Sequence, residues 1–344
     1  MQNKRRFSHW IQCSLPANIS VPSSLKLEAL AGDAGFRRYY RLNTQPSLIA
    51  VNSPPLKEKN PAYVNIALFL QAEGVRTPKI YAVNFEQGYI LLEDFGERLF
   101  QHELCLENQS CLYDKAESTL LEIQNCPVEN SPTPDYNHQK LAEELALFER
   151  WFVRELLGIR LGADEKATLD QLFEQLIDNA LQQPQFLVHS DYHSRNLMLL
   201  EDDQIGVIDF QDAMRGAITY DLVSLLKDCY VRWPATWVKQ RALNFKQRLE
   251  KEGTLVNIDD KQFMQWFDLM GLQRHIKVLG IFARLALRDH KKAYLQDIPL
   301  VVRYCLEAAD GYRKTAEFSL WFKQAVVPLL TEQSWYQEHR DAEL

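Results

Sequence analysis

The sequence lacks a run of apolar residues long enough to cross a membrane, and its six cysteines form no C-x-x-C pair. It also lacks a basic excess, because 39 Lys and Arg residues stand against 46 Asp and Glu, a formal net charge of −7. These absences argue against a membrane-spanning protein, a zinc knuckle, a thioredoxin-like site and a general nucleic-acid binder. With no signal peptide and reduced thiols, the sequence predicts a cytoplasmic protein.

The first hundred residues contain short apolar or alternating runs separated by turn residues, a pattern typical of strands. One helical pattern interrupts them, beginning at Pro61 and ending before Gly74. The predicted strands are 27–30, 38–42, 48–52, 80–84 and 89–93. A small antiparallel sheet with one helix is therefore expected.

From Leu99 onward the pattern becomes helical, and residues 126–137, rich in proline, read as a loop. The predicted helices are 141–157, 168–181, 220–231, 261–290 and 299–312. At 344 residues the chain is longer than one ordinary domain, so two lobes are expected. We predict an α+β fold with a small nucleotide-binding lobe, residues 1–94, and a larger helical lobe for catalysis and substrate, residues 95–344.

Inside the helical part lies one β-type segment, residues 186–210. Its apolar runs 197–200 and 205–208 flank a polar turn, which predicts a β-hairpin. A hairpin brings its outer ends together, so Asn196 and Asp209 should lie side by side. Their oxygen atoms suit a hard cation such as Mg²⁺.

The residues His189–Asn196 fit the pattern H-x-D-x-x-x-x-N, and Asp209 begins a D-F-Q sequence where D-F-G would stand. Together they resemble the catalytic loop and metal-binding strand of the protein-kinase-like superfamily. The resemblance implies that Asp191 orients the acceptor hydroxyl and receives its proton. It also implies that Asn196 and Asp209 hold Mg²⁺ against the phosphates of ATP.

A rival interpretation takes His189, Asp191 and His193 as metal ligands, since alternate residues of a strand face one way. That arrangement would serve a metal-dependent hydrolase, but it gives the hairpin, Asn196 and Asp209 no role. We interpret His189 instead as a buried residue that braces the loop, and leave His193 open.

Downstream, Gly216 and the run Tyr220–Leu222 resemble the aminoglycoside phosphotransferase and choline kinase branch of this superfamily. By itself Asp221 reads as an N-terminal helix cap, favoured by the helix dipole. In the related fold an acid at this place braces the catalytic loop, so the resemblance implies a structural role for Asp221.

The glycines Gly32 and Gly35 lie between two predicted strands, where backbone can approach phosphate oxygens, although an ordinary hairpin would show the same pattern. The predicted fifth strand ends at Glu93 and Asp94, where the lobes are expected to meet. In the superfamily this hinge offers backbone groups to adenine, so both residues are candidates for nucleotide binding.

The third predicted strand aligns with the V-A-I-K motif, but Asn52 stands in place of the phosphate-binding lysine. An asparagine cannot supply a cation. Arg37, Arg38 or Arg41 are candidates to contact the phosphates instead, with Asn52 nearby. Alternatively, the protein binds a nucleotide without transferring phosphate, as a regulator would.

The long predicted helix carries basic residues at helical spacing, namely Arg274, Lys277, Arg284 and Arg288, with His275 beside them. Such a stripe is either a solvated face or an anionic-substrate pocket that reads a carboxylate through arginine. We take Arg274, His275, Arg284 and Arg288 as the candidate substrate residues.

Three segments, 35–42, 91–96 and 208–213, read GFRRYYRL, LLEDFG and IDFQDA. With the long helix they resemble the bacterial anomeric N-acetylmuramate/N-acetylglucosamine 1-kinases of cell-wall recycling. The resemblance implies transfer to the C1 hydroxyl of an amino sugar, and a nucleotidyltransferase that uses the sugar phosphate. A choline-like or aminoglycoside acceptor is the alternative, although aminoglycosides need an acidic lining that the last hundred residues do not concentrate.

Overall fold

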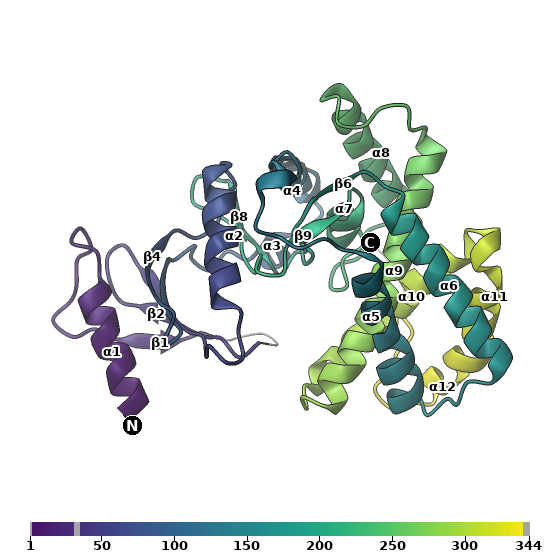
Figure 1. The fold of residues 1–344 in the computed structure, drawn as a ribbon, viewed down its shortest axis with the longest axis horizontal. Coiled ribbons are helices and arrows are strands. Elements are labelled where there is room, and N and C mark those ends of the chain that lie inside the picture. Colours follow the sequence, from purple (N-terminus) through teal and green to yellow (C-terminus); the bar gives the residue numbers. More distant parts are fainter. Residues whose placement is uncertain (1, 31–34, 340–344) are drawn as a thin grey trace. The chain divides into compact units, whose positions relative to one another are not determined.

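In the computed structural model, residues 2–30 and 35–339 are described, and the fold is α+β. The chain forms two compact units, Met1–Thr133 with Arg195–Ala213, and Pro134–Ser194 with Met214–Leu344 (Figure 1). The hairpin thus belongs to the unit that contains the sheet. The expected division of binding functions at residue 94 remains a prediction.

The first unit contains a sheet, its helices and the hairpin. Its elements are α1 (Gln2–Ser14), β1 (Leu27–Ala29), β2 (Arg38–Leu42), β3 (Leu48–Asn52), α2 (Asn60–Ala72), β4 (Ile80–Asn84), β5 (Tyr89–Glu93), α3 (Phe100–Glu103), α4 (Gln109–Gln124), η1 (Val128–Asn130), β7 (Leu197–Leu199) and β8 (Ile205–Val207). The five strands of the sheet are antiparallel in the order β1-β2-β3-β5-β4. The predicted sheet of five strands with a helix after β3 is confirmed.

Helix α1 was not predicted, and it covers one face of the sheet, with α2 on the opposite face (Figure 1). Phe7 and Ile11, one helical turn apart, are buried in a cluster with Leu48, Ala50 and Leu91 of the sheet. Burial on both faces explains why the first four residues of β3, Leu48 to Val51, are all apolar rather than alternating.

The hairpin forms as predicted, with Met198 of β7 opposite Gly206 of β8. The Leu200 N donates to the Gln204 O at 2.9 Å and closes the turn. The Val207 N donates to the Arg76 O at 2.8 Å, which attaches the hairpin to the rest of the first unit.

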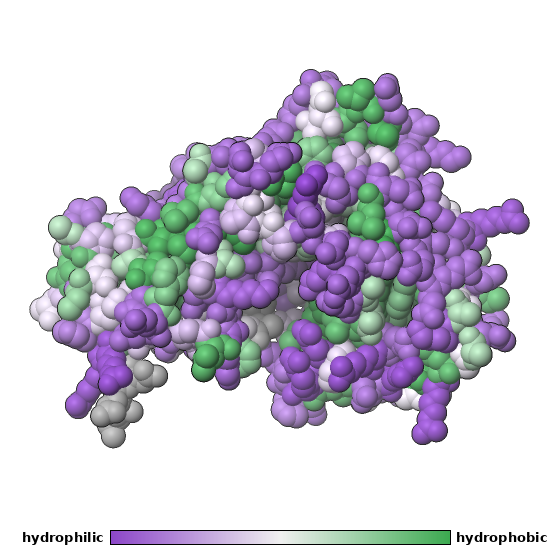
Figure 2. All heavy atoms as spheres, viewed as in Figure 1, coloured by the Kyte–Doolittle hydropathy of each residue, from purple (hydrophilic) through white to green (hydrophobic). Residues whose placement is uncertain are grey.

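The second unit is helical except for one strand pair. Its elements are α5 (His138–Leu147), η2 (Phe148–Leu156, a π-helix), α6 (Ala163–Leu181), β6 (Gln185–Val188), β9 (Met214–Ala217), α7 (Tyr220–Leu226), α8 (Ala235–Lys251), α9 (Asp260–Leu287), η3 (Lys292–Asp297), α10 (Ile298–Asp310), η4 (Arg313–Thr315), α11 (Ala316–Trp321), η5 (Phe322–Val326, a π-helix) and α12 (Val327–Thr331). Hydrophilic residues predominate on the face of this unit seen in Figure 2. No described helix is long and apolar enough to span a membrane.

Several predicted boundaries in the helical part are wrong. The helix expected over 220–231 ends at Leu226, because Asp228 turns its carboxylate to the backbone amides of Ser194 and Tyr230. The helix expected over 141–157 changes from α to π at Phe148. Strand β9 and helices α4 and α8 were not predicted, although α4 buries Leu112, Tyr113, Ala116, Leu120 and Ile123 at helical spacing.

Helix α9 is the centre of the second unit, and most of its length is buried. At Gly280 it meets the backbone where α5 changes to η2: a Cβ there would lie 2.5 Å from the Leu147 C and the Phe148 N. Only a residue without a side chain fits this approach. The α-to-π change therefore occurs at a contact that α9 makes.

We expect Gly280→Ala to destabilise the protein by about 1–3 kcal/mol, because the added methyl group would push two packed backbones apart. The matched control is Gly271→Ala on the same helix, where the nearest atom to the added Cβ is the Val223 Cγ1 at 3.4 Å. That variant should be neutral or stabilised, since alanine favours a helix over glycine. Urea unfolding would check both; equal midpoints for the two variants would contradict the assignment.

Candidate active site

The loop from His189 to Ser194 is held at both ends by buried carboxylates of the second unit. The Asp221 Oδ2 accepts from the His189 N at 2.6 Å, and its Oδ1 accepts from the Ser190 N at 3.1 Å. The Asp228 Oδ2 accepts from the Ser194 N at 2.9 Å. Ser190 has a φ of 81°, a left-handed conformation that a non-glycine residue keeps only when its surroundings impose it.

Asp221 lies within the first turn of α7 rather than at its N-cap, which is Thr219. Burial raises the pKa of Asp221 to about 7, although its bonds to the amides of His189 and Ser190 act in the opposite direction. Asp228 was missed in the sequence, where the only signal was a second acid two turns after Asp221.

Asp191 lies in this braced loop and is partly buried. Burial by itself would raise its pKa, but the positive charges of Lys277, His193 and Arg274 outweigh burial and hold the pKa below its usual value. Asp191 is therefore a carboxylate at neutral pH. In that form it can accept a hydrogen bond from a hydroxyl group.

Lys277 belongs to a buried network that the sequence did not reveal. Its Nζ donates to the Tyr220 Oη at 2.8 Å and lies 3.2 Å from the Glu144 Oε2. The Tyr136 Oη also donates to the Glu144 carboxylate, and the Gln273 Nε2 donates to the Tyr136 Oη at 2.9 Å. Glu144 is one of two adjacent acids in α5, and no sequence signal linked it to α9.

The basic residues of the predicted stripe on α9 differ in burial. Arg274 is only 3% exposed, and its Nη1 donates to the Cys229 Sγ at 3.5 Å. His275 is also buried, with its Nε2 2.9 Å from the Lys227 O and its ring stacked on Tyr304. Burial, with Arg274 beside it, lowers the pKa of His275 to about 3, so this side chain is neutral and adds no charge to the stripe.

The other two basic residues lie nearer the surface. Arg288 is exposed and its guanidinium donates to both carboxylate oxygens of Asp289, at 2.8 and 2.9 Å. Arg284 is partly buried, and burial together with the charge of Arg288 lowers its pKa. The four candidate substrate residues thus occupy different environments, and only Arg274 combines deep burial with a positive charge.

In the first unit, strand pairing extends beyond the hairpin to the two candidate metal ligands. The Ile208 N donates to the Asn196 O at 3.0 Å. Asn196 and Asp209, which follows Ile208, therefore both lie at the open end of the hairpin. Asp209 has a φ of 64°, and its Oδ1 accepts from the Gln211 Nε2 at 2.8 Å. Amide and carboxylate oxygens at this end form a donor set that fits Mg²⁺.

Asn52 ends β3, opposite Arg38 and Tyr89 in the sheet. The next residue, Ser53, contacts a buried cation, because its Oγ accepts from the Arg37 Nε at 3.3 Å.

The Arg37 Nη2 lies 3.6 Å from the Glu58 Oε2, and the Glu58 Oε1 also accepts from the Phe36 N at 2.7 Å. An arginine–glutamate pair therefore stands close to where the lysine and its glutamate partner were missing. The Arg37 guanidinium also lies over the Tyr63 ring, which stacks on Phe210, the residue after Asp209.

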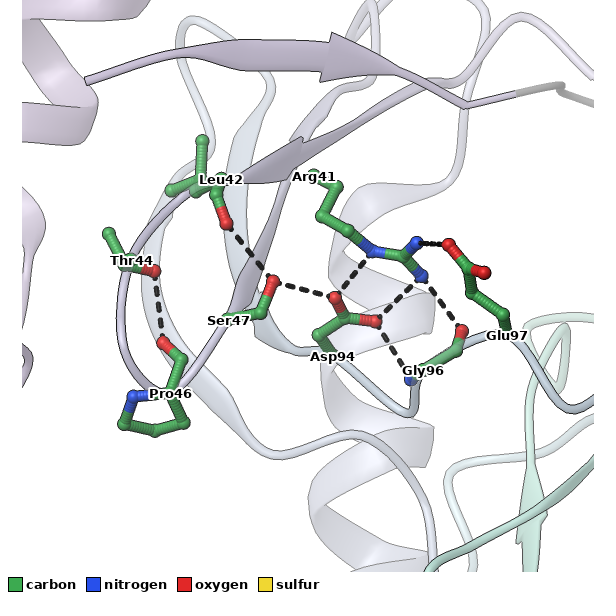
Figure 3. Close-up of polar contacts among 8 residues, drawn as sticks. All are labelled: Arg41, Leu42, Thr44, Pro46, Ser47, Asp94, Gly96 and Glu97. Carbon is green, nitrogen blue, oxygen red and sulfur yellow. Dashed lines mark hydrogen bonds and ion pairs between the residues drawn. The ribbon is translucent and has the colours of Figure 1, made fainter. Parts of the chain in front are cut away.

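The remaining nucleotide candidates have structural contacts. Both carboxylate oxygens of Glu93 accept from the guanidinium of Arg76, which lowers the pKa of Glu93 against the effect of burial. Figure 3 shows Asp94 between Arg41 and Ser47, with the Arg41 Nε donating to the Asp94 Oδ2 at 2.6 Å. These two side chains are thus occupied by protein contacts, and the Glu93 N donates to the Lys79 O at 2.8 Å.

Gly32 lies outside the described residues. Gly35 and Arg38 are exposed, and the Arg38 Nη1 donates to the Gly35 O at 3.2 Å. Arg41 is held by acids, since it also donates to Glu97, so it is not the free cation that the sequence allowed.

The metal-hydrolase interpretation is wrong. In the part of the chain that the structure describes, no group of three His, Cys, Asp or Glu side chains is placed to hold a metal ion. The reason is local: the His189 Nδ1 accepts from the Asp191 N at 3.3 Å, and the His193 ring meets the Tyr230 ring edge to face. His189 is buried and lies within the loop.

Comparison with known proteins identifies the family. A sequence model of the phosphotransferase enzyme family matches residues 26–253. The N-acetylmuramate/N-acetylglucosamine kinase of Pseudomonas putida is 38% identical, covering 86% of this chain and 87% of its own. The kinase of the same name from Pseudomonas aeruginosa is 36% identical, covering 91% and 94%.

The fold agrees with these relatives. The solved structure of Plasmodium vivax ethanolamine kinase matches with a TM-score of 0.61 and 12% identity, covering 85% of this chain and 83% of that one. This likeness concerns the fold alone, which is protein-kinase-like. The chain belongs to the phosphotransferase enzyme family.

Proposed function

We propose that this protein transfers the γ-phosphoryl group of ATP to the anomeric hydroxyl of N-acetylmuramate and N-acetylglucosamine. The observation that carries the proposal is the ionised Asp191 in a braced loop, in a chain whose relatives of the same length are kinases of that name. The sugar 1-phosphate would be formed in the cytoplasm during cell-wall recycling. A sugar-phosphate nucleotidyltransferase would then consume it.

In the proposed reaction Asp191 accepts a hydrogen bond from the C1 hydroxyl. As the hydroxyl oxygen bonds to the γ-phosphorus, the bond from that phosphorus to the bridging oxygen breaks, ADP leaves and Asp191 receives the proton. Most of the rate would come from positioning, because phosphoryl transfer asks for little covalent chemistry from the protein. The amide bonds of Asp221 and Asp228 support that role by fixing the loop.

We assign ATP to residues 1–94, with Gly35 and Arg38 near the phosphates and the backbone of Glu93 and Asp94 near adenine. Asn196 and Asp209 would hold Mg²⁺, which neutralises phosphate charge when bound. The structure supports this donor set through the hairpin pairing that places the two residues at one end.

Arg37 replaces the missing lysine in this proposal, because it is a buried cation beside the end of β3. We expect Arg37→Met to raise the KM for ATP by roughly 10- to 100-fold, the usual worth of a charged hydrogen bond. Arg37→Lys should recover part of the affinity. Steady-state kinetics at saturating sugar would measure the effect.

The control for Arg37 is Lys26→Met, which removes an exposed positive charge from the same unit. An ATP KM that is unchanged in Arg37→Met would show that another group binds the phosphates.

Lys277 should set the pH range of the reaction, since its charge lowers the pKa of Asp191. In Lys277→Met that pKa rises, so Asp191 takes up its proton at higher pH and the acid limb of kcat/KM moves upward. Profiles with N-acetylglucosamine from about pH 4 to pH 8 would show the shift. Circular dichroism at each pH would separate it from unfolding.

The control for the pH profile is Lys251→Met, which removes an exposed lysine of the same unit. Profiles of Lys277→Met and wild type that superimpose would contradict the role given to Lys277.

The function itself is tested by ATP consumption with Mg²⁺ across N-acetylmuramate, N-acetylglucosamine, choline and an aminoglycoside. We expect turnover with the two amino sugars and a product that carries phosphate at C1, seen by ³¹P NMR. Preferential turnover of choline or the aminoglycoside would overturn the substrate. Tight ATP binding without turnover of any acceptor would support a nucleotide-binding regulator instead.

A further inference from the structure

Two buried cations, Arg274 and Lys277, lie one turn apart on α9. Both act on the charge of Asp191, so both are near the proposed reaction. They differ in how their own charges are balanced. Lys277 is paired with Glu144 at 3.2 Å and donates to Tyr220.

Arg274 has no such partner. Its one hydrogen bond is to the neutral thiol of Cys229, and within the described residues no carboxylate oxygen lies within 4.0 Å of its guanidinium. Among the described residues, no other nitrogen of Arg274 is both inaccessible to solvent and without a hydrogen-bond partner. Burial opposes the charge of Arg274, which is 3% exposed, whereas the charges of Asp191 and Asp228 favour it from farther away than an ion pair. An anion from outside the protein would supply the direct ion pair that the described residues do not provide.

The position of Arg274 links it to the reacting loop. Cys229, which accepts its hydrogen bond, follows Asp228, and Asp228 holds the Ser194 amide at the end of the loop that carries Asp191. A sugar whose hydroxyl meets Asp191 would therefore bring its substituents close to this guanidinium. The planar fork of arginine binds a carboxylate through two parallel hydrogen bonds.

N-acetylmuramate carries a lactyl carboxylate, and N-acetylglucosamine does not. We infer that Arg274 binds this carboxylate and so determines the preference of the enzyme for N-acetylmuramate over N-acetylglucosamine. The inference rests on the proposed function. Arg274 is then a specificity-determining residue, whereas the Lys277–Glu144 pair should affect the phosphorylation of both sugars equally.

The experiment compares the two sugars on one preparation of each variant. The ratio of their kcat/KM values does not depend on how much of the protein is folded, and any effect through Asp191 cancels. We expect Arg274→Gln to lower the N-acetylmuramate to N-acetylglucosamine ratio by roughly 10- to 100-fold. Arg274→Lys should lie between, because it keeps the charge without the fork, and Arg313→Gln, an exposed arginine, should keep the wild-type ratio.

A second probe removes the charge from the sugar. The methyl ester of N-acetylmuramate should be a poorer substrate than the acid for wild type, but equal to it for Arg274→Gln. An unchanged ratio in Arg274→Gln would overturn the inference while leaving the proposed function intact, and so would equal losses for both sugars. Wild-type protein that phosphorylates neither sugar would overturn both.

Discussion

Asp191→Asn is expected to lower kcat by roughly 100- to 10,000-fold while the affinity for ATP stays the same, because the variant cannot accept the proton of the sugar hydroxyl. The side chain keeps its shape, and the loop keeps its amide bonds to Asp221 and Asp228. Single-turnover phosphorylation of N-acetylglucosamine would measure the loss. Equilibrium titration with ATP would measure the binding that we expect to survive.

The control is Asp178→Asn, an exposed acid on α6 of the same unit. If Asp191→Asn kept the wild-type rate, Asp191 would not be the proton acceptor. If ATP affinity fell together with the rate, Asp191 would act on the nucleotide and the division of roles between the loop and the hairpin would be wrong.

Asp209→Asn is the second large effect that we expect, a loss of roughly 100- to 1,000-fold in kcat/KM for ATP. Replacing a carboxylate by an amide removes one negative charge from the proposed magnesium ligands, so more Mg²⁺ should also be needed for half-maximal rate. Rates measured across a Mg²⁺ titration at fixed ATP would show both changes. Asn196→Ala should move the magnesium requirement in the same direction by a smaller amount.

The matched control lies in the same hairpin. Asp202→Asn changes an exposed acid of the turn but keeps the oxygen that accepts from the Gln204 N. It should leave the Mg²⁺ requirement unchanged. A requirement that shifts equally in Asp202→Asn and Asp209→Asn would mean that the hairpin acts through its overall charge and not through a bound ion at its open end.

Elements whose signals are short and local were predictable. Strands β2, β3, β4 and β5 have the predicted bounds, because the apolar or alternating pattern of a strand is visible within five residues. The hairpin was predictable for the same reason, and so was its consequence that Asn196 and Asp209 share one end. The loop from His189 was recognisable because its spacing is characteristic.

The helical part was less predictable, since helix ends depend on what the neighbouring side chains do. Helix α7 stops at Leu226 because the Asp228 carboxylate accepts a hydrogen bond from the Ser194 N, thirty-four residues earlier in the sequence. Helix α5 becomes π-helical where α9 presents Gly280. Neither cause is visible within the segment it affects.

The sequence alone determined that this is a phosphotransferase-like chain with a sheet, a hairpin and a loop carrying Asp191, because those features rest on near neighbours. Only the tertiary structure decided the charges around them. It paired Lys277 with Glu144, 133 residues away in the sequence, and gave Arg274 on the same helix no ion pair with any described residue. It also placed Arg37 beside the end of β3, near the missing lysine. Pairing depends on distance in space, and a helical stripe cannot show which of its charges will be buried beside an opposite one.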